Sequence, residues 1–352
     1  MLGFSVYLGR DLTAIDYNYL ITMRNAGFDT IFTSLQIPEE DPSKVLARLK
    51  ELTKWCQNLD LEVLADVSED SLKNMGVDVA DVGQVQALNL TGLRIDDGIA
   101  MNIVAKLSKS MPIALNASTI TDEQLTQLKE YNAAFSHLQA WHNFYPRPET
   151  GLDSQWFKEK NDWLKQYDFE IAAFVPGDGE LRGPIFAGLP TLEKHRYQNP
   201  LADALELKQL GCDHVFIGDA SLKSSTIDSF TNYLKKNAIT LHLDEDVEEL
   251  TTNTWHNHPD AARDVIRLVE SRNRQLFNIE PIAAVSRPMG SVTCDNDKYL
   301  RYKGEVEITK RDLPADEKVN VLTHINPEDL QLLNYVDSGR QIIFVKKEDE
   351  SE

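Results

Sequence analysis

Short runs of apolar and β-branched residues alternate with longer amphipathic stretches from the start of the chain to about residue 240. We count eight such runs, at residues 4–8, 30–35, 62–67, 92–96, 113–118, 137–143, 170–175 and 214–218. In the longer stretches, such as 42–59, apolar residues recur at intervals of three and four positions, which is typical of amphipathic helices. Ser43 is placed to cap the start of that helix. The alternation predicts repeated βα units around a parallel sheet.

Eight repeats favour one closed (β/α)₈ TIM barrel, an α/β fold. The main alternative is a doubly wound open sheet, which would normally carry a glycine-rich GxGxxG turn after its first strand. The corresponding segment here, SVYLGRDLT, has no such turn. The chain also contains no P-loop, HExxH or EF-hand signature, so the common nucleotide and metal motifs do not compete with the barrel interpretation.

The pattern changes after about residue 240. The segment LHLDEDVEELTTNT is acidic and rich in Thr, a helix is expected at about 259–271, and short strand-like runs follow. These runs are SVTCD, YKGEVEI, VNVLTHI and RQIIFVKK, separated by turn-forming sequences. We therefore expect a barrel domain at 1–240 and a small, mainly β domain at 241–352. The last residues, KEDESE, lack apolar anchors and are expected to be frayed.

The balance of charge limits the classes of partner. Lys and Arg number 36 against 56 Asp and Glu, which gives a formal net charge of -20. Such a surface repels nucleic acid and anionic membranes, so we expect neither as a partner. A few local Arg residues can still bind an anionic small molecule. The N-terminal sequence MLGFSVYLGRDLT does not resemble a signal peptide, and no apolar run reaches membrane-spanning length, so a cytoplasmic protein is expected.

The cysteines do not indicate a metal site or a disulfide framework. Cys56, Cys212 and Cys294 are widely spaced and form no CxxC pair. Cys56 falls in an amphipathic helix pattern, and Cys212 follows a Gly in a helix-to-strand turn. We interpret all three as packing residues, with a nucleophilic role as the alternative, and expect no metal and no cofactor.

Polar side chains gather where the predicted strands end. Parallel barrels place their active sites at this rim, built from the C-terminal ends of the strands. The rim residues are Asp66 and Ser68 after the third run, Arg94, Asp96 and Asp97 in the fourth, Asn116 and Ser118 in the fifth, and His142, Asn143, Tyr145, Arg147 and Glu149 after the sixth. This clustering marks the rim as the candidate active site.

The alternation of side chains along a strand indicates which of these residues point into the barrel. In the fourth run, Leu93 and Ile95 would face the helices, and Arg94 and Asp96 would point inward. An internal ion pair of Arg94 with Glu62 or Asp96 that only joins strands is an equally strong interpretation for this Arg. For Asp66 and Asp96 we favour a functional role, because carboxylates at strand ends are where barrels place catalysis.

The seventh run is followed by a long loop, FVPGDGELRGPIFAGLPTLEKHR, which carries Asp178, Arg182, Glu193 and Arg196. Long ordered loops of this kind are commonly functional, although a plain surface connection is the alternative. Arg182 and Arg196 are candidate anion ligands. After the eighth run, the segment 218–221 lies where barrels often bind a phosphate on backbone N–H groups.

Strand-end carboxylates without a metal cluster or a nucleophile elbow point to acid/base chemistry, and glycoside hydrolysis needs such a pair. Tyr145 could stack on a sugar ring. Two alternatives stay open. One is a barrel lyase or aldolase that acts on a sugar phosphate through a Schiff-base lysine, although no Lys lies at a predicted strand end. The other is a non-catalytic sugar-phosphate binding protein.

Four segments carry a specific family resemblance. LNAST, HNFYPRPETGL, PGDG followed by RGP, and GLPTLEKHR, in this order, resemble the bacterial 6-phospho-N-acetylmuramidases, formerly an uncharacterised family of TIM-barrel outer surface proteins. The resemblance covers nearly the whole chain, since the family carries a cyclophilin-like C-terminal β domain. It implies hydrolysis of the β-1,4 bond in N-acetylmuramic acid 6-phosphate–N-acetylglucosamine, a phosphorylated disaccharide of peptidoglycan recycling in the cytoplasm.

The resemblance also assigns site residues. Asp96 and Glu149 are both motif matches. Our own mechanistic hypothesis makes Glu149, which lies past a strand end beside aromatic residues and two Pro residues, the general acid, and Asp96 its partner carboxylate, which either attacks the anomeric carbon or orients the 2-acetamido group for attack. The expected substrate-binding residues are Asp66, Asn116, Ser118, His142, Asn143, Tyr145, Arg147, Asp178, Arg182, Glu193 and Arg196. The family motif has an aromatic residue where this chain has Asp97. In the second domain, Asp295, Asn296, Tyr299, Arg301 and Tyr302 resemble motif positions. The oligomeric state is not determined by the sequence, and a homodimer stays open.

Overall fold

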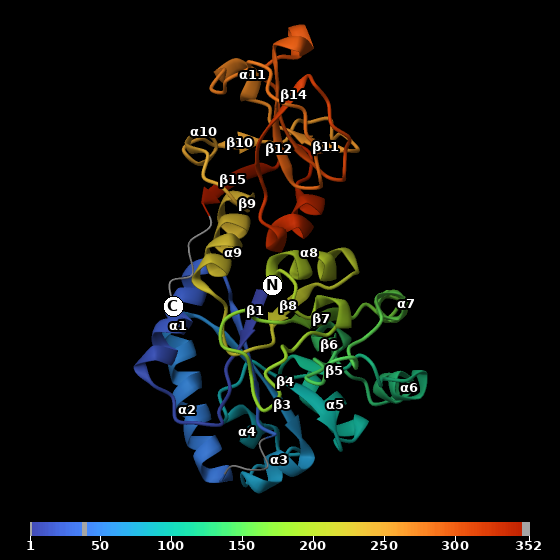
Figure 1. The fold of residues 1–352 in the computed structure, drawn as a ribbon. Coiled ribbons are helices and arrows are strands. Elements are labelled where there is room, and N and C mark those ends of the chain that lie inside the picture. The colour runs from blue at the N-terminus through green and yellow to red at the C-terminus, as the bar shows by residue number, and fades with distance from the viewer. Residues whose placement is uncertain (1, 37–40, 347–352) are drawn as a thin grey trace. The chain divides into compact units, whose positions relative to one another are not determined.

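The structure, a computed structural model, describes residues 2–36 and 41–346. Contacts divide the chain into two compact units, Met1–Ile227 and Asp228–Glu352. Figure 1 shows a ring of strands surrounded by helices in the first unit and a set of short strands in the second. The terminal segment 347–352, for which fraying was expected, lies outside the described residues.

The first unit is a closed parallel barrel, as the alternation of the sequence predicted. Neighbouring strands pair in sequence order, and β1 closes the ring by pairing with β8. The strands are β1 (Leu2–Ser5), β2 (Thr30–Ser34), β3 (Glu62–Ser68), β4 (Gly92–Asp97), β5 (Ile113–Asn116), β6 (Leu138–Trp141), β7 (Glu170–Val175) and β8 (His214–Ile217). β1 begins earlier than the predicted run 4–8, because Leu2 pairs with Val215 of β8.

Helices follow the strands and form the outer layer of the first unit (Figure 1). They are α1 (Ala14–Ala26), α2 (Pro42–Leu59), α3 (Glu69–Asn74), α4 (Val82–Gln86), α5 (Met101–Ser108), α6 (Asp122–Glu130), α7 (Ser154–Lys165) and α8 (Pro200–Gln209), with 3₁₀ turns η1 (Phe135–His137) and η2 (Glu193–His195). Helix α9 (Ser224–Lys236) begins in the first unit and continues into the second. The expected cap of α2 was wrong. Asp41 is its N-cap and accepts the Ser43 N–H at 2.8 Å, because Pro42 takes the first helical position.

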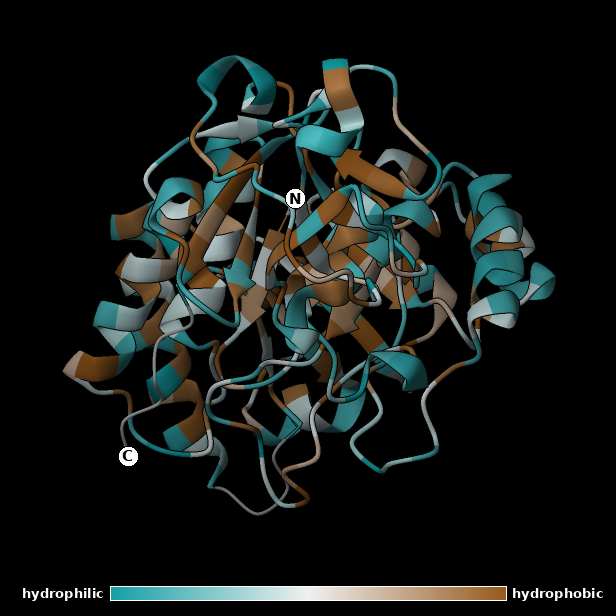
Figure 2. Ribbon diagram, turned by 45° about the horizontal axis from the view of Figure 1, so that its top comes forward, coloured by the Kyte–Doolittle hydropathy of each residue, from teal (hydrophilic) through white to brown (hydrophobic). Residues whose placement is uncertain are grey.

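The barrel strands consist mostly of hydrophobic residues, and the surrounding helices carry both hydrophobic and hydrophilic residues (Figure 2). The barrel interior is filled by a layer of apolar, mostly aromatic side chains, the aromatic layer, as expected for a packed barrel rather than a pore. Its members are Phe32, Leu64, Ala114, Trp141, Ala172, Phe174 and Phe216, with Phe144 packed against them. Gly3 of β1 makes room for this layer, because a Cβ there would fall on the Phe216 ring and lie 2.9 Å from the carbonyl oxygen of Thr30.

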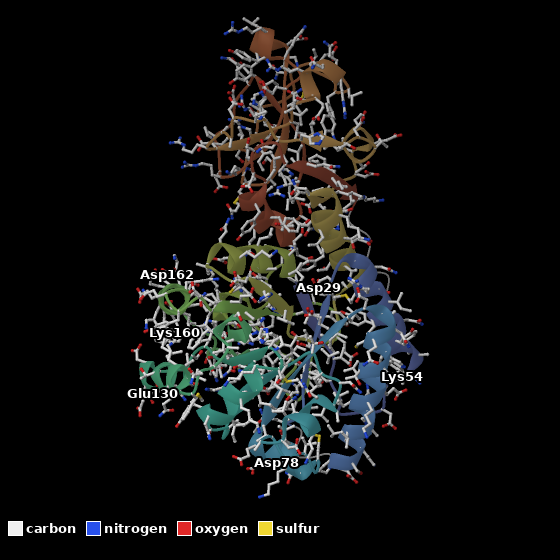
Figure 3. The ribbon with its side chains drawn as sticks, turned by 180° about the vertical axis from the view of Figure 1, so that it is seen from behind. Asp29, Lys54, Asp78, Glu130, Lys160 and Asp162 are labelled. Carbon is white, nitrogen blue, oxygen red and sulfur yellow. The ribbon has the colours of Figure 1, made fainter. Side chains whose placement is uncertain are left out.

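Charged residues of the helices and their connections lie on the outside of the barrel unit. Figure 3 shows Lys54, Asp78, Glu130 and Asp162 at its periphery, away from the strands, and all four are exposed. Among the described residues, no helix combines the length and apolar composition needed to cross a membrane.

The second unit is mainly β, as predicted, and contains two sheets. One has the order β10-β15-β9 and the other, fully antiparallel, has the order β11-β13-β12-β14. The strands are β9 (Ala238–Leu243), β10 (Trp255–His256), β11 (Val265–Arg267), β12 (Ser291–Asp295), β13 (Val306–Thr309), β14 (Val319–His324) and β15 (Gln341–Lys346). The short helical pieces are α10 (Glu248–Thr251), α11 (Ser271–Arg274), η3 (Asp297–Tyr302) and η4 (Pro327–Tyr335).

The helix expected at 259–271 was wrong, since this stretch contains β11 and the helical turn α11 begins only at Ser271. Ile266 is fully buried between the half-buried Val265 and Arg267, an alternation with the period of a strand, and β11 pairs with β13. Strand β9 was not anticipated, although Ile239 and Leu241 alternate with Thr240. Tertiary pairing therefore decided both segments.

The three cysteines are free and buried, in agreement with a packing role. Burial raises the pKa of Cys56 and of Cys294 to about 12, and also raises the pKa of Cys212. These thiols therefore stay protonated at neutral pH and are poor nucleophiles.

Candidate active site

A polar layer lies one step beyond the aromatic layer, toward the C-terminal ends of the strands. Ser34, Asp66 and Arg94 are successive register partners on β2, β3 and β4. They lie two residues beyond Phe32 and Leu64, which are also register partners. Because side chains with a period of two share a face, the same inward face that carries the aromatic layer carries these polar groups.

Arg94 is the centre of this layer and is 4% exposed. Its Nη1 donates to Asp66 Oδ1 and, at 3.3 Å, to Asp96 Oδ1, and its Nη2 donates to Asn143 Oδ1. Of the two ion pairs suggested for Arg94, the one with Asp96 is present. Glu62 lies at one end of β3, and the main partner of Arg94, Asp66, lies toward the other. Arg94 thereby joins side chains from β3, β4 and the segment after β6.

Gln36, which sequence reasoning missed, completes the layer. Its Nε2 donates to Asp66 Oδ2 at 2.9 Å and to Asp96 Oδ2 at 3.4 Å. Burial raises the pKa of Asp66, and the neighbouring Arg94 opposes that rise. The side chain of Asp96 is 36% exposed, against 12% for Asp66. Asp96 is therefore the carboxylate of this pair that is more accessible to a ligand.

Asn116 and Ser118 lie at the end of β5, and His142 follows β6. Asn116 Oδ1 accepts the Ser118 N–H at 3.0 Å, and Ser118 Oγ lies 3.5 Å from His142 Nδ1. The His142 ring is completely buried against Phe157 of α7, and its Nε2 lies 2.8 Å from Asn161 Oδ1. Burial lowers the pKa of His142 to about 4, so the imidazole is neutral. Its contacts place it between strand and helix.

The loops after β6 and β7 are joined by one carboxylate, Glu193. Its Oε1 accepts the N–H of Glu149 at 2.8 Å and its Oε2 accepts the N–H of Gly151 at 2.7 Å. Arg196 donates from Nε to Oε1 at 2.7 Å and from Nη2 to Oε2 at 2.8 Å. These hydrogen bonds, those from Arg196 first, lower the pKa of Glu193 to about 2. Glu193 is therefore ionised at neutral pH and has no proton to give.

Arg196 is 6% exposed and its remaining donors are directed at the backbone. Nη1 donates to the carbonyl oxygens of Ala187 at 3.0 Å and Gly188 at 3.1 Å, and Nη2 donates to that of Tyr145 at 2.9 Å. The guanidinium expected to bind a substrate anion is thus engaged with the protein. Glu149, by contrast, is exposed and has a φ of 72°, a left-handed conformation unusual for a non-glycine residue.

Thr191 is a second residue that sequence reasoning missed. It is fully buried, and its Oγ1 donates to the carbonyl oxygen of Asn143 at 2.9 Å and accepts the Phe174 N–H at 2.9 Å. The Tyr145 N–H donates to the carbonyl oxygen of Pro190 at 2.9 Å. Hydrogen bonds therefore hold the segment with Asn143 and Tyr145 against the segment with Pro190 and Thr191, which follows β7.

The first part of the β7 loop is held by Asp219, which follows β8. Its carboxylate accepts the N–H groups of Gly177 at 2.9 Å, Arg182 at 2.9 Å and Leu189 at 3.0 Å. The Arg182 guanidinium carbon lies 3.7 Å from the Tyr7 ring centroid and 5.9 Å from that of Phe144. Among the described residues, no carboxylate forms a salt bridge with Arg182. Because Phe144 packs on the aromatic layer, this cation lies at the top of the barrel.

Several backbone N–H groups of the segment after β8 already have hydrogen-bond partners within the protein. The Ser221 N–H donates to the carbonyl oxygen of Glu180 at 3.2 Å, and the Leu222 N–H donates to Tyr19 Oη at 3.1 Å. The Lys223 N–H donates to Asp178 Oδ1 at 2.9 Å. Within 218–221 the Gly218 and Ser221 N–H groups are used by the carbonyl oxygens of Val175 and Glu180, and the phosphate site expected on this segment stays a prediction. Asp178 acts as a cap for the start of α9.

The structure thus sorts the expected residues into groups. Asp66, Asp96 and Asn143 meet around Arg94, and Tyr145, Arg147 and Glu149 lie on the loop joined to Glu193 and Arg196. Arg147 is exposed, and among the described residues its guanidinium has no ion-pair partner. Within residues 2–36 and 41–346, no group of three or more His, Cys, Asp and Glu residues could hold a metal ion. The arrangement offers carboxylates, an amide and two guanidinium groups without a salt bridge, at the end of the barrel beyond the aromatic layer, a set suited to an anionic sugar.

Two family models of the same name match this chain, and together they cover nearly all of it. Residues 2–232 match the family described as 6-phospho-N-acetylmuramidase, N-terminal, and residues 237–345 match 6-phospho-N-acetylmuramidase, C-terminal. A crystal structure of a conserved Enterococcus faecalis protein with an unknown function is 42% identical, with a TM-score of 0.91, and the match covers 99% of this chain and 96% of that one. A crystal structure of an uncharacterized B. cereus protein is 28% identical, with a TM-score of 0.74 and coverage of 98% and 99%. Among curated proteins the search found no match.

Proposed function

Since this chain belongs to the 6-phospho-N-acetylmuramidase family, and so is a glycosidase, we propose that it hydrolyses the β-1,4 bond between N-acetylmuramic acid 6-phosphate and N-acetylglucosamine. Such a phosphorylated disaccharide is a fragment of peptidoglycan inside the cell. We accordingly assign the protein to peptidoglycan recycling in the cytoplasm.

The observation that carries the proposal is the cluster of Asp66, Arg94 and Asp96 at the ends of β3 and β4, together with the exposed Glu149 on the loop after β6. Glycoside hydrolysis uses two carboxyl groups, one protonated and one ionised. We assign the role of general acid to Glu149 and that of partner carboxylate to Asp96. The positively charged guanidinium of Arg94 lies 3.3 Å from the Asp96 carboxylate. Asp96 either attacks the anomeric carbon or orients the 2-acetamido group of the substrate for that attack.

The anionic groups of the proposed substrate need positively charged partners in the site. The substrate carries a phosphate and a lactyl carboxylate, and arginine is well suited to both. We assign these groups to Arg182 and Arg147, whose guanidinium groups form no salt bridge within the described part of the chain, although Asp219 lies close enough to Arg182 to interact with its charge. Arg196 and His142, which have protein partners, are assigned to support of the site. Tyr145, Asn116 and Ser118 are proposed to contact the sugar.

The test is incubation of the full chain with the disaccharide, with and without its 6-phosphate, and detection of released N-acetylglucosamine by mass spectrometry. We expect product from the phosphorylated form and little from the other. Asp96→Asn and Glu149→Gln should each lose most of the turnover, and near-wild-type turnover by both would refute the assignment. Trapping of the substrate by borohydride would favour the Schiff-base lyase or aldolase, and tight binding without product would favour a binding protein.

A further inference from the structure

The loop that carries Glu149 has its conformation set by another loop. The backbone of Glu149 is in the left-handed region, and its N–H is held by Glu193 Oε1 at 2.8 Å. Two residues later, Gly151 donates to the other oxygen of the same carboxylate at 2.7 Å. A Cβ on Gly151 would lie 2.7 Å from Glu193 Oε2 and 2.6 Å from the Glu193 nitrogen, so the two loops approach as closely as a glycine allows.

Arg196 in turn fixes the orientation of the Glu193 carboxylate. The two form a bidentate pair with distances of 2.7 and 2.8 Å, which is the most directional geometry available to an ion pair. The same guanidinium binds the carbonyl oxygens of Ala187 and Gly188 on the β7 loop and of Tyr145 on the β6 loop. The pair thus spans both loops.

We propose that Glu193 and Arg196 are positioning residues, which hold the backbone of Glu149 so that its carboxyl group is aimed at the glycosidic oxygen. This inference rests on the proposed function and deepens it. Neither residue needs to touch the substrate, because both oxygens of Glu193 and the guanidinium of Arg196 already have protein partners. A small displacement of a catalytic group lowers the rate of proton transfer more than it lowers binding.

The chemistry provides a readout that general loss of structure would not give. When the C–O bond to N-acetylglucosamine breaks, Glu149 gives its proton to the glycosidic oxygen, so that the sugar leaves as a neutral alcohol. A nitrophenyl group leaves readily as an anion and needs no such proton. Glu149 recovers its proton from the water that completes hydrolysis, so only the bond-breaking step, which kcat/KM reports, is independent of the acid for a nitrophenyl glycoside. A misplaced general acid therefore lowers kcat/KM for the disaccharide and spares kcat/KM for a nitrophenyl glycoside of N-acetylmuramic acid 6-phosphate.

The experiment measures kcat and KM of the full-length wild type, Glu193→Gln and Arg196→Lys on both substrates. We expect kcat on the disaccharide to fall about tenfold or more in each variant, within the range by which general acid catalysis contributes. On the nitrophenyl glycoside kcat/KM should change less than about threefold, and KM on the disaccharide should change little. Gly151→Ala, which pushes on the Glu193 carboxylate, should behave in the same way and serves if one of the other variants does not fold.

Lys194→Ala is the matched control. Lys194 lies between the two positioning residues on η2, but its ammonium group pairs with Glu206 of α8, so this variant should keep wild-type kinetics on both substrates. Equal losses on both substrates for Glu193→Gln, or a change confined to KM, would overturn the inference. Glu149→Gln separates the two levels: if it shows the selective loss and Glu193→Gln does not, the inference fails and the proposed acid stands. If the wild type does not cleave the disaccharide, the proposed function itself fails.

Discussion

Arg94 and Asp66 form an ion pair within the barrel in which the two side chains are only 5% and 12% exposed. A buried pair of this kind adds little net stability, because the attraction mostly offsets the cost of removing both charges from water. Removing one partner is costly, since the other charge is left buried. The pair therefore makes the polar layer sensitive to single substitutions and tolerant of matched ones.

We predict that Arg94→Met lowers the free energy of unfolding by about 3–5 kcal/mol. Asp66 would retain Gln36 as a donor but would lose its counter-ion, and burial already raises its pKa. The loss should be larger at pH 8 than at pH 5, because protonation of Asp66 relieves the buried charge. Urea unfolding followed by circular dichroism at both pH values measures this.

The double variant Arg94→Met with Asp66→Leu should regain most of that loss. Lys158→Met is the control, since Lys158 and Asp162 form an exposed pair with a distance of 2.9 Å on α7. Pairs of that kind contribute about 0.3–0.5 kcal/mol. Equal effects of Arg94→Met and Lys158→Met would contradict the buried-pair argument.

Gly3→Ala tests how tightly the aromatic layer is packed. Its Cβ would overlap the Phe216 ring and approach the carbonyl oxygen of Thr30 to 2.9 Å, and a strand cannot shift easily within a closed barrel. Overpacking of this kind costs about 1–3 kcal/mol of unfolding free energy. Gly9→Ala, where a Cβ meets nothing within 4 Å, should leave the midpoint of urea unfolding unchanged. A neutral Gly3→Ala would mean that the layer is more loosely packed than the contacts indicate.

The barrel could be predicted from sequence because its signal is local and repeated. Each strand is an apolar run, and burial of both sheet faces makes such runs conspicuous. The second unit was harder, because its strands are short and are stabilised by partners far along the chain. β11 pairs with β13 across about forty residues, and local helix propensity gave the wrong prediction there. β9 shows the required alternation but lies where the composition changes.

The candidate site was predictable in its residue types and not in their partners. Arg182 and Arg196 lie on the same loop, and the sequence does not distinguish them. In the structure the Arg196 guanidinium donates to Glu193 and to backbone carbonyl oxygens, whereas that of Arg182 lies over the Tyr7 ring. Only the folded loop decides which donors stay free. Gln36 carries no local signal at all, because its amide gains meaning through carboxylates on two other strands.

The second unit should lose stability as the pH rises from 5 to 8. Asp295 and Glu307 lie near Thr293 on paired strands, and burial, with repulsion from neighbours such as Glu305, raises the pKa of each to about 7. A carboxyl group whose pKa is raised on folding stabilises the folded state below its unfolded pKa, and that contribution is lost as the pH rises through 7. Glu307→Gln should therefore raise the unfolding free energy at pH 8 by about 1–3 kcal/mol and change it little at pH 5.

Glu317→Gln is the control for this pH dependence. Glu317 is in the same unit, and its ion pair with Lys298, at 2.8 Å, lowers its pKa, so it stays ionised from pH 5 to 8. Thermal unfolding of the full chain at the two pH values distinguishes the variants. If Glu307→Gln showed the same fall in stability as the wild type, the buried carboxyl groups would not be its cause.

Arg182 should contribute mainly to recognition of the substrate anion. Its guanidinium carbon lies 3.7 Å from the ring centroid of Tyr7, whose hydroxyl donates to the carbonyl oxygen of Gly218, so the cation has a fixed place before the substrate binds. A hydrogen bond to a charged group contributes about 1.5–3 kcal/mol, so Arg182→Gln should raise KM for the phosphorylated disaccharide roughly 10- to 100-fold with a smaller change in kcat. The kcat/KM ratio between the phosphorylated and unphosphorylated disaccharides should shrink by the same factor. Arg10→Gln is the matched control, because Arg10 is already paired with Asp16 at 2.8 Å, and it should keep both parameters. An unchanged ratio in Arg182→Gln would move the phosphate to another cation, and Arg147→Gln would then be the variant in which to look for the loss.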